Sequence, residues 1–405
     1  MSLFFQGKKE YKAQSLQAIA WGKFRKNRQG MFLLCLLGLI TVVAVLGYLI
    51  TPDSTPCANE QILEIRLQKP MSKVTFLQLT NKQSAEKRNI IQKMFYGQPA
   101  YFVSIPVSDY RFVADTVIVC LLHEAPPYNI VSYNLVDVVY PHEVNSPVSF
   151  DGQTCSFFDK NAALKTYSVE KLQTEVRQQI RTKTYYLGTD RYGRDVLSQL
   201  IIGARVSLSV GFVSVFIALI IGMFLGAVAG YFRGIIDDVI MWFINVVWSV
   251  PTLLLVIAIS FVLGTGFWQL FVAIGLTMWV DIARVVRGQI ISLREKEFVE
   301  ASKALGFGSL TIIFKHIIPN ITGTIIVVCA ANFASAILTE ASLSFLGIGV
   351  QPPMPSWGTM IKENYGYIIL DYAYLAIIPG VSIMLLVLCF MLTGNILRDV
   401  LDVKE

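Results

Sequence analysis

The residues most suited to a chemical role lie where polar groups are least expected, inside the apolar run 321–347. Four of them recur at helical spacing: Asn332, Ser335, Thr339 and Ser342. A polar helix face in a membrane either bonds to neighbouring helices or lines water, and the spacing leaves both interpretations open. Glu340 lies to the side of this face and requires a polar cavity or a partner. If water fills that side of the helix, these five residues line a translocation pathway.

The chain carries none of the local signatures of catalysis. Its three histidines, His123, His142 and His316, are isolated from one another, and no HExxH or paired CxxC motif supports a metal site. The absence of G-x-x-x-x-G-K-[ST] argues against ATP binding by a phosphate loop, and the absence of G-x-S-x-G argues against a serine hydrolase. We therefore expect no catalytic residue, no metal and no cofactor in this chain.

A second group of residues lies in the more polar stretch 289–320, between two apolar runs. One apolar helix face is predicted from four positions: Phe298, Ala301, Ala304 and Leu305. Three charged residues lie toward the other side: Glu297, Glu300 and Lys303. A short amphipathic helix of this kind suits docking into a groove of another protein. A helix lying on lipid headgroups is the alternative.

Residues that bend the chain mark both ends of this helix. Gly306 is well placed to end it in the left-handed conformation. Gly308 and Ser309 allow a sharp change of direction, and Ser309 can cap a second helix at 310–318. Pro319 then closes the second helix before the next apolar run.

A third group forms a turn just before another apolar run, and it contains Gly188, Thr189, Asp190, Gly193, Arg194 and Asp195. The glycines allow tight turns, and the charged side chains can fix them by hydrogen bonds. A rigid entry to the following helix is favoured, because short Gly/Asp turns are common folding devices. An element of an outer gate is the alternative.

The elements that must position these groups are apolar helices. The 405-residue chain is 54% hydrophobic and only 15% charged, whereas about a quarter of the residues of a soluble domain are charged. Residues 31–50 carry no charge and are long enough to cross a bilayer core of about 30 Å. Five further runs are comparable: 205–230, 238–263, 268–288, 321–347 and 372–396. The composition predicts an all-α integral membrane protein with six transmembrane helices, the first at 30–50.

Basic residues in the N-terminal segment 1–29 predict the orientation of these helices. They are Lys8, Lys9, Lys12, Lys23, Arg25, Lys26 and Arg28, against the single acid Glu10. Positive charge stays on the cytoplasmic side, so alternation places 51–186 outside and both 289–320 and the C-terminus inside. The net charge is +6, and the excess of basic residues lies beside an apolar run. The orientation of the chain in the membrane explains this excess more simply than nucleic-acid binding.

The segment 51–186 resembles a folded α+β domain inserted between the first two spans. Its alternation and β-branched residues predict strands at 62–67, 74–80, 100–105, 112–122 and 128–140, and its spacing predicts helices at 84–95 and 168–181. Asp151-Gly152 marks a turn. Cys57, Cys120 and Cys155 permit one disulfide, and the sequence leaves all three pairings open.

The order of several motifs resembles a known family. Glu300-Ala301-Ser302, then Gly306 and Ile317-Ile318-Pro319, resemble the EAA loop of ABC-importer permeases. Three other stretches, 187–208, 337–361 and 394–402, are similar to the C-type permease of dipeptide, oligopeptide and nickel importers. The resemblance covers the first span and the permease core 187–405.

This resemblance implies the type I importer fold and a set of partners. The helix in 289–320 would be a coupling helix seated in a cleft of a separate ATPase, with ATP and Mg²⁺ held there and not in this chain. A second (B-type) permease, two ATPase subunits and an external substrate-binding protein would complete the importer in the bacterial cytoplasmic membrane. Transport would proceed by alternating access, with peptides or a related small solute such as nickel as cargo.

The sequence departs from the family pattern in three places. Ser302 stands where the family usually has Ala, and Asn395 and Val403 replace the usual Asp and Pro. The segment 51–186 is far longer than the usual outer loop, so the family predicts nothing about it. The alternative function is a membrane-anchored sensor or assembly protein in which this segment binds a ligand.

Overall fold

The structure, a computed structural model, describes residues 16–80, 88–122, 129–140, 148–159, 163–264 and 266–401. The chain divides into two compact units. The first combines Met1–Ile40, Ser209–Leu343 and Ile383–Glu405, and the second combines Thr41–Leu208 and Ser344–Ser382. Some features of the sequence analysis lie outside the described residues: Lys8, Lys9, Glu10, Lys12, residues 84–87, His123, His142 and Val403.

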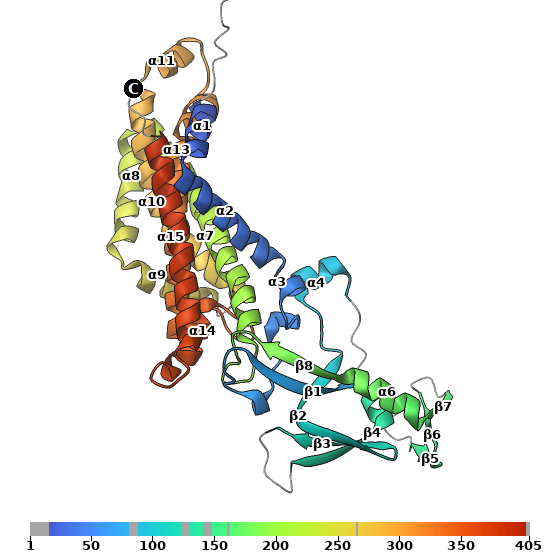
Figure 1. Ribbon diagram of the computed structural model, residues 1–405. Helices are drawn as coiled ribbons and strands as arrows, with labels where there is room; N and C mark the ends of the chain where they lie inside the picture. Colours follow the sequence, from blue (N-terminus) through green and yellow to red (C-terminus); the bar gives the residue numbers. More distant parts are fainter. Residues whose placement is uncertain are drawn as a thin grey trace, which may run out of the picture. The chain divides into compact units, whose positions relative to one another are not determined.

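Helices dominate the chain outside its strand-rich region (Figure 1). They are α1 (Leu16–Lys26), α2 (Arg28–Val45), α3 (Gly47–Ile50), α7 (Val196–Phe232), α8 (Gly234–Ser249), α9 (Thr252–Leu263), α10 (Phe267–Arg294), α11 (Glu297–Ala304), α12 (Ser309–Thr311), α13 (Ile318–Leu346), α14 (Trp357–Asn364) and α15 (Tyr374–Leu401). A π-helical turn, η3 (Ile312–Ile317), joins α12 to α13, and a 3-10 turn, η4 (Tyr365–Tyr367), follows α14.

Five helical stretches of the described chain are long and apolar enough to cross a membrane. They are Arg28–Val45, Val196–Phe232, Phe267–Arg294, Ser309–Leu346 and Tyr374–Leu401. Each overlaps one of the expected spans, so five of the six predicted runs form single long helical stretches.

The sixth run, expected as one helix at 238–263, is broken in the structure. It forms α8 and α9, which meet at an angle of 95° and make either a broken span or a re-entrant loop. Pro251 causes the break, because proline has no N–H to donate and disfavours the helical conformation in the residue before it. Val250 accordingly adopts extended angles, φ −91° and ψ 130°.

Within the first unit, α7 and α10 approach each other closely along a line of glycines. A Cβ at Gly222 would lie 2.7 Å from the carbonyl oxygen of Trp279, and one at Gly226 would lie 2.5 Å from that of Ala283. Only small residues allow such a separation. The glycines therefore fix the position of α10, which leads directly to α11.

The strand-rich region belongs to the second unit. Its elements are η1 (Pro56–Ala58), η2 (Leu63–Ile65), β1 (Ser72–Thr80), α4 (Ile90–Tyr96), β2 (Phe102–Val113), β3 (Thr116–Leu121), β4 (Ile130–Asn134), α5 (Leu135–Val139), β5 (Ser149–Phe150), β6 (Thr154–Phe158), β7 (Leu164–Ser168), α6 (Val169–Gln179) and β8 (Ile180–Tyr185). Five strands form an antiparallel sheet in the order β4-β3-β2-β1-β8, and three form a second sheet in the order β5-β6-β7. Ser72 pairs with Tyr185, so the chain enters and leaves the larger sheet at one point.

An apolar core of its own stabilises this region. Helices α5 and α6 pack against each other and against β1. Leu172 and Val176, four residues apart on α6, are fully buried with Leu77 of β1 and Phe157 of β6. Since successive residues of a strand point to opposite faces, β1 also supplies Phe76 to a second cluster on the other face of the sheet.

Most of the elements expected in this region are confirmed. β1 and the first part of β2 coincide with the strands expected at 74–80 and 100–105, and the segment 112–122 forms the end of β2 and β3. The helix expected at 168–181 is α6, capped by the Ser168 side chain, although its last residues already belong to β8. The described part of the helix expected at 84–95 contains most of α4.

Two strand predictions are wrong for physical reasons. The segment 62–67 forms η2 instead of a strand, because its backbone bonds to the turn near residue 190: Leu67 N–H donates to the Asp190 carbonyl at 3.0 Å. The segment 128–140 is a strand only as far as Asn134. The Asn134 side chain accepts a hydrogen bond from the Val136 N–H and so starts α5.

Candidate functional site

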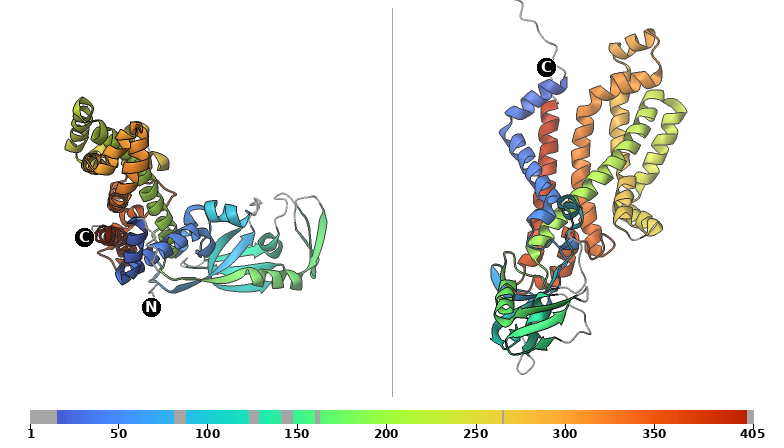
Figure 2. Two further views of the ribbon diagram at one scale, coloured as in Figure 1. Left: turned by 90° about the horizontal axis from the view of Figure 1, so that it is seen from above. Right: turned by 90° about the vertical axis from the view of Figure 1, so that its right-hand side faces the viewer.

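The expected short helix in 289–320 is α11, and it lies beyond the ends of α10 and α13 in both figures (Figures 1 and 2). It begins after Lys296, whose backbone is extended, and ends at Ala304, with Leu305 as its C-cap. Gly306 follows with φ +80°, which confirms the predicted left-handed residue. Because a Cβ there would meet nothing within 4 Å, backbone strain alone favours glycine at this position.

One side of α11 is buried and the other is exposed. Val299 and Ser302 are buried, and the Ser302 hydroxyl donates to the Phe298 carbonyl of the same helix at 2.7 Å. The exposed residues are Glu297, Phe298, Glu300, Ala301, Lys303, Ala304 and Leu305. The departure from the family's alanine at Ser302 therefore lies on the covered side. The exposed surface combines the apolar Phe298 and Leu305 with two carboxylates.

The segment after α11 differs from the expected second helix at 310–318. Gly308, not Ser309, precedes α12, and no side chain caps it. Pro319 does not close a helix, because α12, η3 and α13 form one continuous helical stretch, Ser309–Leu346. Proline is tolerated in the first turn of α13, where the π-helical turn before it has already changed the hydrogen-bond register.

The polar residues of α13 do not share one environment. Asn332 is buried and its amide donates weakly, at 3.5 Å, to the Met278 carbonyl of α10. Ser335 and Ser342 are exposed on this chain, and Thr339 is half-buried. The hydroxyls of Thr339 and Ser342 donate to carbonyls of their own helix at 2.8 and 2.7 Å. Glu340 is fully buried, so it belongs to the interior and not to an exposed face.

The turn 188–195 lies in the second unit and is built around the Asp190 carboxylate. Asp190 Oδ1 accepts hydrogen bonds from the backbone N–H groups of Tyr192 and Arg194, each at 2.9 Å. Its Oδ2 accepts one from Arg194 Nε at 2.7 Å. Thr189 is also buried, and its hydroxyl donates to the Ile65 carbonyl. These contacts close the turn around the buried Asp190 carboxylate, both of whose oxygens accept hydrogen bonds.

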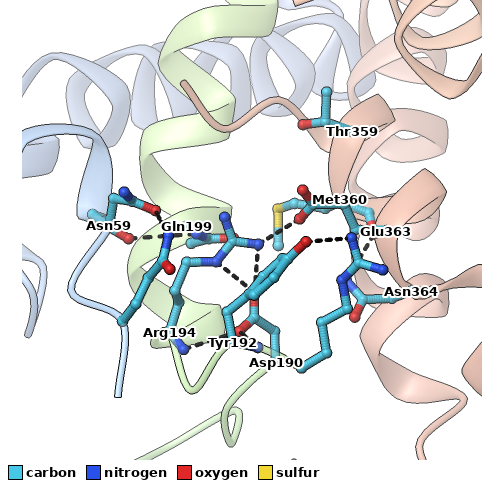
Figure 3. Close-up of polar contacts among 12 residues, drawn as sticks. Asn59, Asp190, Tyr192, Arg194, Gln199, Thr359, Met360, Glu363 and Asn364 are labelled. Atoms are coloured by element: carbon cyan, nitrogen blue, oxygen red, sulfur yellow. Dashed lines mark hydrogen bonds and ion pairs between the residues drawn. The ribbon is translucent and has the colours of Figure 1, made fainter. Parts of the chain in front are cut away.

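Glu363 of α14 completes this cluster, and the sequence analysis missed it. Arg194 forms ion pairs with both Asp190 and Glu363, and its guanidinium lies 4.7 Å from the Tyr192 ring (Figure 3). Burial by itself would lower the pKa of Arg194, but the two carboxylates raise it above its usual value. Glu363 is 169 positions away in the chain, so no local pattern connects it to Arg194.

Gly188, Gly193 and Asp195 complete the predicted turn. Gly193 has φ +74°, and a Cβ there would overlap the Ile62 carbonyl oxygen at 1.8 Å. The carboxylate of Asp195 is buried and accepts a hydrogen bond from Ser198 in the first turn of α7. The structure thus brings all six predicted residues together at the start of α7.

Neither metal-binding groups nor disulfides occur within the described ranges. No set of three His, Cys, Asp or Glu side chains there could hold a metal ion. Cys57, Cys120 and Cys155 are all free thiols.

Two family models match parts of the chain. The family described as binding-protein-dependent transport system inner membrane component matches residues 222–404, and that described as the N-terminal TM domain of oligopeptide transport permease C matches 15–70. The strands β1 to β8 fall between the two matched segments.

Several curated proteins are similar over about half of the chain. The dipeptide transport system permease protein DppC of Alkalihalophilus pseudofirmus is 43% identical over 54% of this chain and 72% of its own length. The glutathione transport system permease protein GsiD of Pectobacterium atrosepticum is 39% identical over 55% and 74%. Among solved structures, an inward-facing MetNI methionine ABC transporter chain is 21% identical over 50% of this chain and 96% of its own, with a TM-score of 0.42.

Proposed function

The chain belongs to the binding-protein-dependent inner-membrane permeases of the oligopeptide C type, and we propose that it is one of two membrane subunits of an ABC importer for peptides or related small solutes. Its relatives are permeases of dipeptides, oligopeptides and glutathione by name. As a permease the chain is not an enzyme. ATP hydrolysis, with its Mg²⁺, belongs to a separate ATPase subunit.

The observation that carries this proposal is the exposed surface of α11. Proteins normally bury large apolar residues such as Phe298 and Leu305, yet here these two residues are 40% and 76% exposed. An apolar helix face rimmed by carboxylates fits a groove of a partner protein. We assign this surface to the cleft of the ATPase, with Glu297, Glu300, Ala301 and Ala304 as the other contacting residues.

The connection between α11 and the spans suits force transmission. Two residues separate α10 from α11. The backbone hydrogen bonds that follow Gly306 turn the chain back toward α13. A displacement of α11 by the ATPase would therefore move α10 and α13 together. Alternating access follows if the hydroxyls of Ser335, Thr339 and Ser342 line the pathway that these helices open and close.

The membrane orientation is also proposed. In the first unit, α1 and α11 lie at the same end of the long helices in Figure 1 and in the right-hand view of Figure 2. Since α1 ends with Lys23, Arg25 and Lys26, the positive-inside rule assigns that end to the cytoplasm. Both termini and 289–320 would then be cytoplasmic, and the segment 51–186 would lie outside, where the substrate-binding protein arrives. We propose that this segment helps to dock or retain that protein.

Co-purification tests the assignment directly. The tagged chain, co-expressed with its B-type permease and ATPases, should retain the ATPases in detergent. Replacing Phe298 and Leu305 by Asp should release the ATPases and leave the two permeases associated. Ser302→Ala, on the covered side of α11, is the matched control and should bind normally. An intact chain that never retains an ATPase, or a double variant that retains it fully, would favour a sensor or assembly role.

A further inference from the structure

Helix α4 presents apolar side chains to its surroundings and not to the protein. Ile90 and Ile91 are 75% and 70% exposed, and Phe95 and Tyr96 are 51% and 68% exposed. At 100° per residue Ile90, Ile91 and Phe95 fall on one side of the helix, Gln92 lies beside Phe95, and Lys93, which is half-buried, lies toward the other side. An exposed apolar surface of this kind marks an interaction site.

Backbone hydrogen bonds hold α4 in place, and the described residues leave its apolar side exposed. The Gly97 N–H donates to the Lys93 carbonyl, and the Gln98 N–H donates to Ser54 at 2.7 Å. At the same end Arg88 donates to the Tyr96 and Gly97 carbonyls at 2.8 and 2.9 Å. A seven-residue helix is unstable alone. These contacts fix its position, so its apolar side is a built feature and not a frayed end.

The ends of two apolar runs indicate where α4 lies relative to the membrane surface. Helix α4 packs against α3, whose last residue, Ile50, ends the first run. Arg205, where the second run begins, donates to the Met94 carbonyl of α4 at 2.8 Å. The Arg205 guanidinium also lies 5.7 Å from the Tyr48 ring of α3. Since the ends of two membrane crossings mark the bilayer surface, α4 is fixed at that surface.

We propose that α4 is an interfacial membrane anchor whose Ile90, Ile91 and Phe95 insert among the lipid headgroups and upper acyl chains. The exposed apolar residues of α3, Leu49 and Ile50, continue into this face, so one lipid-facing surface runs from the first span onto α4. Aromatic residues such as Phe95 and Tyr96 favour the membrane–water boundary. The Arg205 guanidinium, which lies 5.3 Å from the Phe95 ring, suits lipid phosphates. The anchor would hold the strand-rich region against the membrane whichever side that region occupies.

Fluorescence in lipid bilayers tests this anchor. The complete importer, with the six native cysteines replaced, carries an environment-sensitive NBD label at Ile91→Cys or at Lys93→Cys and is placed in nanodiscs of phosphatidylethanolamine and phosphatidylglycerol. The label at 91 should emit at shorter wavelength than the label at 93. Lipids spin-labelled near the headgroup should quench it several-fold more strongly than lipids labelled deep in the acyl chain.

Two results would overturn the anchor. Equal emission at both positions without lipid quenching would place the helix in water, and a shifted emission without lipid quenching would mean that a protein surface covers it. Ile91→Trp and Lys93→Trp, which keep the native cysteines, provide a second measurement. Dibrominated lipids should quench the added Trp only at position 91, and the anchor is wrong if the two variants behave alike.

Discussion

Arg287 of α10 donates two hydrogen bonds to the Asp237 carboxylate of α8, at 2.5 Å from Nε to Oδ1 and 2.6 Å from Nη2 to Oδ2. Asp237 lies in the first turn of α8, where the helix dipole stabilises an anion. Arg287 lies about two turns before the end of α10, which leads to α11. The pair therefore connects the broken segment α8–α9 to α10, the helix that leads to the docking surface on α11.

Breaking this pair should destabilise the complex and weaken coupling. Arg287→Ala should lower the free energy of unfolding by about 1.5–3 kcal/mol, because charge-assisted hydrogen bonds contribute that much. A double-mutant cycle with Asp237→Ala, read from thermal unfolding in detergent, measures the coupling between the two residues. The exposed pair Arg233–Glu295 is the control, and its loss should cost less than about 1 kcal/mol. Equal losses at both pairs would contradict the prediction.

Backbone strain at the end of α11 should uncouple the importer. Gly306→Val forces a β-branched residue to φ +80°, at a cost of about 1 kcal/mol or more. Gly308→Val is a matched control, since Gly308 has φ −67° and ψ 152° and equal free space. ATPase activity stimulated by the binding protein should fall in the first variant only. Normal stimulation in both would remove the coupling role of this turn.

The polar residues of α13 should differ in their access to water. In a background without native cysteines, Cys at Ser335, Thr339 and Ser342 should react with a hydrophilic thiol reagent. Asn332→Cys should be protected, because Asn332 packs against α10. Ile326, exposed on the opposite side of α13, supplies a lipid-facing control. Uniform protection in both nucleotide states would leave packing as the role of all four residues.

Asp195 should make the stability of the complex fall with rising pH. Burial raises the pKa of Asp195 above its ordinary 3.8, and the Ser198 hydrogen bond opposes part of that rise. Because the pKa of Asp195 is higher in the folded state than in the unfolded state, its protonation favours the folded state at pH values below the unfolded pKa. This contribution is lost as the pH rises through the native pKa. Asp195→Asn keeps an acceptor for Ser198 and removes this loss.

The unfolding temperature of the unsubstituted complex should therefore fall relative to that of Asp195→Asn between about pH 4 and neutral pH. Asp109→Asn, on the exposed side of β2, controls for the change in net charge. Parallel pH profiles of the Asp195→Asn and unsubstituted complexes would show that Asp195 does not govern this dependence.

Removing the strand-rich region should leave an assembled importer that captures its binding protein poorly. Because Ser72 and Tyr185 are paired, a short Gly/Ser linker can replace residues 73–184 without separating the ends. The replacement also keeps Ile62 and Ile65 beside the turn 188–195. Binding-protein affinity and transport should both fall relative to the intact chain. If both are unchanged, the docking role is wrong.

The sequence alone predicted five of the six apolar spans as single helical stretches, because membrane crossing depends on the local length and composition of a run. It also predicted α11 and the left-handed Gly306, since a helix end is set by the few residues around it. The strands with clear alternation, such as β1, followed from the same local rule.

Tertiary contacts decided the rest. The turn 188–195 was expected from Gly193 and Asp190, but only the fold brings Glu363 to Arg194. Residues 62–67 have a strand pattern, yet bonds to that turn prevent a strand there. The pairing of Asp237 with Arg287, 50 positions apart in the chain, likewise depends on a distant partner. A local pattern determines which residues can form an element, whereas a hydrogen bond between side chains far apart in the chain exists only where the completed fold places donor and acceptor together.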